Sequence, residues 1–140
     1  MQRPRAFRLA DRASGLITAK LNYPISEWKG IVESAENTFS NAHLDYTLQI
    51  SAGSGVCLTG LLVEQKDVEA MDNAAVAINS LLARCREAEG NMVIQTAPAE
   101  MKGRLKIWGE AGSDFLLMKR IKDQIDPSGI MSPGRFVGGL

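Results

Sequence analysis

The sequence predicts an α+β domain in which two helices cover one face of an antiparallel sheet. Three features predict it: four segments alternate apolar and polar residues, two longer segments carry apolar residues at helical spacing, and the segments follow in the order β-α-β-β-α-β. A third helical segment and an irregular tail come last. A chain of 140 residues is long enough for one such domain with its own core.

The first strand and the first helix are expected on either side of Pro24, which ends the strand. Residues 17–23 alternate between apolar and polar side chains, as in a half-buried strand. Ser26 is expected to cap the next helix, because a serine side chain can accept a hydrogen bond from a free backbone N–H group there. The apolar residues of this helix recur at helical spacing: Trp28, Ile31, Val32, Ala35 and Phe39.

A β-hairpin is expected next. Residues 43–50 alternate without a break, which predicts a strand that begins at His43. The glycine-rich segment 51–55 joins this strand to a second apolar run, residues 56–63. A phosphate-binding loop would need a helix directly after its glycines, so a hairpin turn is the better interpretation of this segment.

Asp67 is expected to cap a second helix, and Gly90 is expected at the C′ position that follows it. Residues 91–97 predict a fourth strand. A third helix is expected from about Ser113 to Asp126, because the following proline disfavours a helical conformation at Asp126. The apolar residues on one side of this third helix are Phe115, Met118, Ile121 and Ile125.

This order of elements is the split β-α-β, ferredoxin-like arrangement. Both crossover helices should cover the same face of the sheet, so that nothing in this core covers the opposite face. The polar residues expected on that open face are Thr18, Lys20, His43, Asp45, Thr47 and Gln49.

Composition argues against several classes of protein. With 16 basic and 16 acidic residues the formal net charge is zero, which does not suggest nucleic-acid binding. RNA-binding domains of the same element order also need aromatic residues on their central strands, and residues 56–63 contain none. No apolar run is long enough for a transmembrane segment, and no signal peptide is expected. One histidine and two cysteines predict no metal site, and reduced thiols in a cytoplasmic protein are expected.

His43 is the candidate catalytic residue on the open face. It lies two residues from Asp45 on the same predicted strand face, so the two side chains could share a site for proton transfer. A solvated or hydrogen-bonded histidine with no catalytic role is the alternative, because a single histidine does not define a site. The candidates to face a substrate are Lys20, Asp45, Thr47 and Gln49.

The chain ends in a tail of turns. Residues 126–129, Asp-Pro-Ser-Gly, suit a type I turn, and residues 132–135, Ser-Pro-Gly-Arg, suit a type II turn. Two successive turns fix the path of the tail and hold Arg135 at a defined point. A guanidinium group held in this way is suited to binding a phosphate or a carboxylate.

Residues 107–139 resemble the carboxyl-terminal end of FAD-linked oxidases of the vanillyl-alcohol-oxidase type, and most closely that of the FAD-binding E subunits of bacterial glycolate oxidases. That ending has a Trp-Gly pair, a helix and then Asp-Pro-x-Gly-x-x-Asn-Pro-Gly-Arg. The rest of the chain agrees with the family only in the order of its elements. The matching residues are Trp108, Gly109, Asp126, Pro127, Gly129, Pro133, Gly134 and Arg135, with Ser132 in place of the family's asparagine.

The resemblance implies an FAD-dependent oxidoreductase that passes a hydride from a 2-hydroxy acid such as glycolate to the flavin. In this family FAD is bound mainly by an amino-terminal domain, which is therefore the implied missing partner, together with other glycolate oxidase subunits. The chain would be the cap domain that walls the substrate pocket, and alone it should be inactive and retain no FAD. The cofactor-contacting residues that the resemblance implies are Ser132, Pro133, Gly134 and Arg135.

The resemblance also implies a division of the chain. Residues 1–14 would be a lead-in or severed linker, residues 15–126 the cap domain, and residues 127–140 a tail that docks on the flavin domain. The protein would be cytoplasmic, and it would reach the membrane only through partner subunits. Related D-type subunits carry a histidine-rich metal motif that this chain lacks, so no metal is expected.

A free-standing ferredoxin-like module is the alternative to a cap domain. Such a module would bind a small molecule, or dimerise through its open sheet face, without any flavin. A cap domain should do neither strongly, so binding and self-association separate the two hypotheses.

Overall fold

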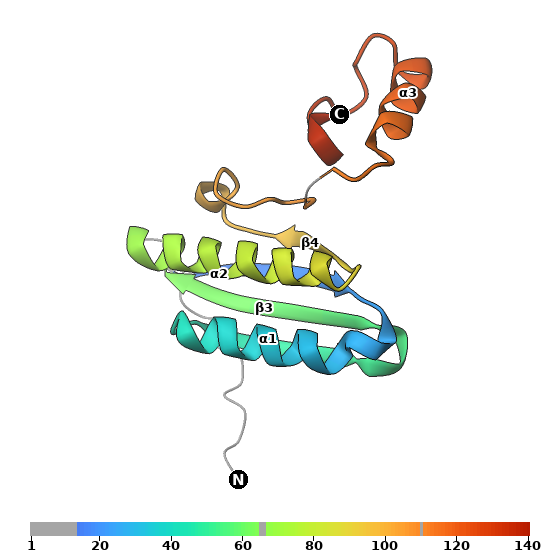
Figure 1. The fold of residues 1–140 in the computed structure, drawn as a ribbon. Coiled ribbons are helices and arrows are strands. Elements are labelled where there is room, and N and C mark those ends of the chain that lie inside the picture. Colours follow the sequence, from blue (N-terminus) through green and yellow to red (C-terminus); the bar gives the residue numbers. More distant parts are fainter. Residues whose placement is uncertain (1–13, 65–66, 110) are drawn as a thin grey trace.

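The computed structural model describes residues 14–64, 67–109 and 111–140, and it confirms the α+β class and the order β-α-β-β-α-β, followed by a third helix (Figure 1). The predicted residues 1–13 of the lead-in lie outside the described part of the chain. The helices and strands are β1 (Ser14–Asn22), α1 (Trp28–Asn41), β2 (Asp45–Ser51), β3 (Val56–Glu64), α2 (Val68–Glu87), β4 (Asn91–Thr96) and α3 (Phe115–Ile125).

The four strands form one antiparallel sheet in the order β2-β3-β1-β4. β1 and β2, which α1 connects, are therefore parallel to each other with β3 between them, as a ferredoxin-like arrangement requires. Figure 1 shows α1 and α2 side by side on one face of this sheet. The opposite face is covered by no element that the described residues form.

The core lies between the two helices and the sheet. Alternate residues of β1, namely Ile17, Ala19 and Leu21, are buried, as the alternation of the sequence predicts. From α1, the fully buried Phe39 reaches the ring of Tyr46 on β2, with 5.4 Å between ring centroids. A side chain of this size contributes on the order of 2–3 kcal/mol when it is removed from water. The buried residues of α2 include three alanines, Ala74, Ala75 and Ala77.

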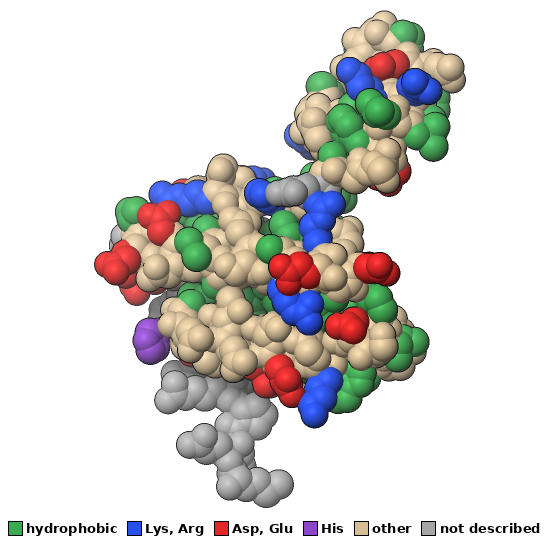
Figure 2. Space-filling model, viewed as in Figure 1, with side chains coloured by type: hydrophobic (Ala, Val, Ile, Leu, Met, Phe, Trp, Pro, Cys, Tyr) green, Lys and Arg blue, Asp and Glu red, His purple; other side chains and the backbone are tan. Residues whose placement is uncertain are grey.

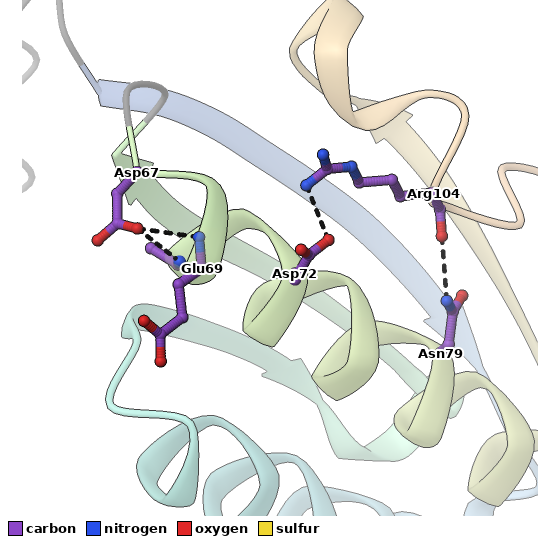
Figure 3. Close-up of polar contacts among 6 residues, drawn as sticks. Asp67, Glu69, Asp72, Asn79 and Arg104 are labelled. Atoms are coloured by element: carbon purple, nitrogen blue, oxygen red, sulfur yellow. Dashed lines mark hydrogen bonds and ion pairs between the residues drawn. The ribbon is translucent and has the colours of Figure 1, made fainter.

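The start of α2 agrees with the sequence, whereas the start of α1 does not. The Asp67 carboxylate accepts hydrogen bonds from the backbone N–H groups of Glu69, at 2.9 Å, and Ala70, at 3.1 Å (Figure 3). Ser26 caps nothing, because it lies within a 3-10 turn, Ile25–Glu27, that leads directly into α1. The prediction missed this turn because Pro24 and the residues after it also suit a short 3-10 segment.

Both crossover helices end in a Schellman motif. At the end of α2, Glu89 is the left-handed C′ residue, with φ 57°, and the N–H of Gly90 donates to the carbonyl of Cys85. Gly90 is therefore the C″ residue and not the predicted C′ residue. A side chain at Gly90 would bring a Cβ within 2.5 Å of the Asn22 carbonyl oxygen, so close packing against β1 is what requires glycine here.

The end of α1 corrects the expectation for His43. His43 is the C′ residue of α1 with φ 53°, its N–H donates to Ser40, and the N–H of Leu44 donates to the carbonyl of Phe39. β2 begins only at Asp45. His43 is therefore part of a helix end and not of the polar strand face. Histidine is among the residues that tolerate left-handed backbone, which the alternation of the sequence does not reveal.

The hairpin between β2 and β3 is confirmed. Residues 45–51 pair with residues 62–56 in one unbroken register, and a short 3-10 turn, Ala52–Ser54, joins the strands. Gly55 closes this turn with φ 65°, and its carbonyl accepts a hydrogen bond from the N–H of Tyr23 at 2.8 Å. A Cβ at Gly55 would clash with the Tyr23 carbonyl, so both the backbone conformation and the space require glycine.

The segment after β4 returns to α2 and to the sheet edge. The guanidinium of Arg104 lies 2.8 Å from the carboxylate of Asp72, and the Arg104 carbonyl accepts a hydrogen bond from the Asn79 side chain at 3.2 Å (Figure 3). The N–H of Ile94 on β4 donates to the carbonyl of Ile107 at 2.9 Å. This segment therefore covers the outer side of β4.

Residues 111–140 form what we call the C-terminal lobe, which projects away from the sheet and the crossover helices (Figure 1). Within the lobe, Gly138 lies so close to the Phe115 ring that a Cβ there would clash. The ring of Phe136 lies 5.5 Å from that of Trp108, the one ring contact between the lobe and the preceding segment among the described residues. No residue of α3 is buried, because its predicted apolar side is not packed on the domain core.

Candidate functional site

The open face of the sheet carries a shallow hollow of about 260 Å³. Its centre is Gly60 on β3, which pairs with Thr18 of β1 on one side and with Thr47 of β2 on the other. Because Gly60 has no side chain, the two threonines border an empty space between them. The residues that line the hollow are Leu16, Thr18, Thr47, Gln49, Leu58, Thr59, Gly60 and Gln95.

The hollow combines an apolar base with polar groups at its rim. Leu16 and Leu58 supply apolar surface, while the hydroxyls of Thr18 and Thr47 and two glutamine amides supply hydrogen-bond donors and acceptors. The side chain of Thr59 is buried on the helix side of the sheet. No charged side chain lines it. Its volume is just below the range of about 300–1,000 Å³ typical of small-ligand sites, so it forms one wall of a pocket more readily than a whole pocket.

The structure brings together only some of the predicted site residues. Thr18, Thr47 and Gln49 line the hollow. Lys20 and Asp45 lie in neighbouring rows of the same face, since Lys20 pairs with Leu58 and Asp45 pairs with Leu62. His43 is exposed at the end of α1 and does not line the hollow. His43 therefore does not share a face of β2 with Asp45, because the strand begins only at Asp45.

Several lining residues were not predicted. Leu16, Leu58 and Gln95 are open-face residues of three different strands, and a complete alternation count along each strand would have found them. Gly60 gave a clearer signal, because a glycine in the middle of an apolar strand often marks a place where another group approaches the backbone closely.

The tail adopts both predicted turns. The N–H of Gly129 donates to the carbonyl of Asp126 at 3.0 Å, and the N–H of Arg135 donates to the carbonyl of Ser132 at 3.2 Å. Gly134 has φ 71°, as the third residue of a type II turn requires. Ser132 itself is left-handed, with φ 48°.

Asp126 fixes the path between these two turns, a role that the sequence did not reveal. Its side chain is only 2% exposed. It accepts hydrogen bonds from the N–H groups of Ile130 and Met131, both at 2.9 Å, and from the ammonium of Lys122 at 2.6 Å. The hydrogen bond from Lys122 is the largest cause that lowers the pKa of Asp126, followed by the backbone hydrogen bond from Met131. The Lys122 ammonium also donates to the carbonyl of Met131.

The predicted cofactor-contacting residues lie together on the surface of the C-terminal lobe. Residues 132–135 are all exposed, and the Arg135 guanidinium makes no hydrogen bond or ion pair with a described residue. A free guanidinium on a fixed turn fits a contact with a cofactor phosphate. These four residues form a small exposed surface that cannot enclose a molecule as large as FAD. The main binding surface for FAD would have to come from another domain.

Large apolar side chains are also exposed on the C-terminal lobe. Leu116 and Ile125 of α3 are 67% and 69% exposed, and Ile130 of the tail is 80% exposed. Figure 2 shows apolar and basic side chains next to one another on the lobe. Exposed apolar side chains in this number are typical of interaction sites.

The two cysteines are unpaired and buried, and they are poor nucleophiles. Burial raises the pKa of the Cys85 thiol to about 11, and burial also raises the pKa of Cys57. Both thiols are therefore protonated at neutral pH. Among the residues that the structure describes, no cluster of three or more histidine, cysteine, aspartate or glutamate side chains could hold a metal ion. No helix in the described part is long and apolar enough to cross a membrane.

No protein-family model matches the sequence, and no curated protein matches it.

Proposed function

We propose that this chain is the carboxyl-terminal cap domain of an FAD-dependent 2-hydroxy-acid oxidoreductase, of the vanillyl-alcohol-oxidase type and similar to the E subunit of glycolate oxidase. FAD, when bound by the flavin domain, accepts the hydride. The cap contributes the open face of its sheet as a wall of the substrate pocket. Its C-terminal lobe docks on the flavin domain and brings Arg135 to the cofactor.

The observation that carries the proposal is the conformation of the tail. The resemblance rests on residues 107–139, and both turns of that stretch are formed, with Asp126 holding the segment between them. The left-handed backbone at Ser132 is one that asparagine adopts more readily than most residues, so the family's asparagine would fit here without a change of path. The exposed apolar surface of α3 also suits a lobe that packs on another domain.

The hollow supports the cap role in a second way. Thr18, Thr47 and Gln49 can hydrogen-bond the hydroxyl and carboxylate of a small 2-hydroxy acid, and no charged side chain lines the hollow beside them. The proposal assigns substrate contact to these three residues, with Lys20 and Asp45 beside them. The proposal assigns His43 no substrate contact, because His43 does not line the hollow.

An arginine substitution in the full-length natural protein tests the proposal. Arg135→Ala should reduce FAD retention about tenfold or more, since one hydrogen bond to a charged group contributes about 1.5–3 kcal/mol. Arg120→Ala, which removes another exposed arginine of the same lobe, is the matched control and should retain FAD normally. The melting temperature of the chain should be unchanged in both. Equal FAD retention in the two variants would refute the role of the tail.

The free-standing binding module remains the second candidate, and the hollow is the observation that favours it. Calorimetric titration of the chain with a panel of small metabolites that includes 2-hydroxy acids separates the two. A half-formed pocket should show no saturable binding, whereas a binding module should bind such a ligand without any flavin domain.

A further inference from the structure

The two edges of the sheet are β2 and β4, and they differ in how they are protected. The outer side of β4 receives the Ile94–Ile107 hydrogen bond, and its pairing with β1 shifts register between Thr18 and Ala19. Pro98 follows closely after its end. A covered edge, an irregular register and a nearby proline are features by which proteins prevent an edge strand from pairing with another chain.

β2 has none of these features. It pairs only with β3 among the described strands, and all seven of its residues keep one register without a bulge. It contains no proline, lysine or arginine, and its one charged residue, Asp45, is at its first position. Such an edge presents a row of backbone N–H and C=O groups that are free to pair with a further strand.

We propose that the outer edge of β2 pairs with β2 of a second copy of this chain. The two strands run antiparallel about a two-fold axis at Leu48, so that one sheet continues through both copies. Leu48 is the middle residue of β2, and this register therefore pairs every residue of the strand. Any other two-fold register leaves residues at the strand ends unpaired.

The side chains of β2 are self-complementary in this register. On the helix side, Leu48 meets Leu48 of the second copy, and Tyr46 meets Ile50 of the second copy. Ile50 is 39% exposed although it is on the side that faces the helices, and an aromatic ring opposite a β-branched residue is a favourable cross-strand pair. On the open side, Thr47 meets Gln49, and Asp45 meets Ser51. The two carboxylates therefore never face each other.

This pairing is independent of the proposed function, and it differs from the dimer expected of a free-standing module, which would form through the open face of the sheet. It uses the backbone edge of β2, which would pair in the same way whether or not a flavin domain is present. The hollows of both copies would lie on the same open face of the joined sheet and would remain accessible.

Two substitutions that introduce opposite charges at Ser51 test both the pairing and its register. Ser51 is exposed, and in this register it faces Asp45 of the other copy twice in each dimer. Ser51→Lys should lower the dimer dissociation constant about threefold to tenfold, and Ser51→Asp should raise it by a similar factor. Both effects should shrink in high salt. Ser80→Lys and Ser80→Asp place the same charges on the exposed side of α2 and should leave the constant unchanged.

Sedimentation equilibrium of the chain and these four variants gives the dissociation constants, and thermal unfolding shows that each variant is folded. Edge pairing of one strand predicts a weak dimer, detectable between about 1 µM and 1 mM. A chain that stays monomeric up to about 1 mM overturns the proposal. The proposal is also overturned if Ser51→Lys and Ser51→Asp change the dissociation constant in the same direction, or if neither changes it.

Discussion

Asp126 is the residue on which the conformation of the tail depends most. Its carboxylate joins the end of α3 to the N–H groups of Ile130 and Met131, and its pKa is lowered chiefly by the Lys122 ammonium. Because the folded-state pKa is below that of an unfolded chain, this stabilisation is complete above about pH 4 and is lost as the pH falls through the folded-state pKa.

An NMR titration should therefore show the amide proton chemical shifts of Ile130 and Met131 changing below about pH 4, as Asp126 becomes protonated. Asp126→Asn should expose both amides to faster hydrogen exchange at neutral pH, because an amide side chain has one acceptor oxygen and no charge. Asp123→Asn, an exposed position on the same helix, is the control and should leave both amides protected. Unchanged exchange in Asp126→Asn would show that the tail is held by other contacts.

At the scale of elements, each crossover helix ends in a left-handed residue that is not glycine, and this backbone conformation lowers the stability of the fold. His43 ends α1 in left-handed backbone, which is unfavourable for a residue with a Cβ. His43→Gly should raise the free energy of unfolding by about 0.5–1 kcal/mol in urea titrations. His43→Ala keeps the unfavourable backbone and should give no such increase. If His43→Gly is instead destabilising, the imidazole makes a contribution that the left-handed position does not explain.

The elements were predictable from the sequence wherever one periodicity extended over a whole segment. The alternation of residues 17–23 and the helical spacing of the apolar residues from Trp28 to Phe39 gave the correct elements, and Asp67 gave the correct helix start. Helix ends were less predictable, because His43 continues the alternation of β2 while its backbone belongs to α1. The hollow was half predicted, since the polar residues of the open face were named, whereas the signal of Gly60 in the middle of an apolar strand was not used.

At the scale of the whole molecule, the structure has a packed α+β domain and a lobe that projects from it (Figure 1). The sequence could not reveal that α3 would be left unburied, because its apolar spacing is the same as that of a core helix. Two surfaces are consequently left without cover by the described residues: the open face of the sheet and the apolar side of the lobe. A cap domain needs both, one toward the substrate and one toward the flavin domain.

The flavin content of the full-length natural protein tests this account most directly. We predict that the purified protein carries one FAD per chain, measured by its visible absorbance after release of the cofactor. We also predict that glycolate or another small 2-hydroxy acid bleaches this absorbance in the absence of oxygen, because the substrate reduces the flavin. A natural protein that is colourless and binds no added FAD would contradict the account.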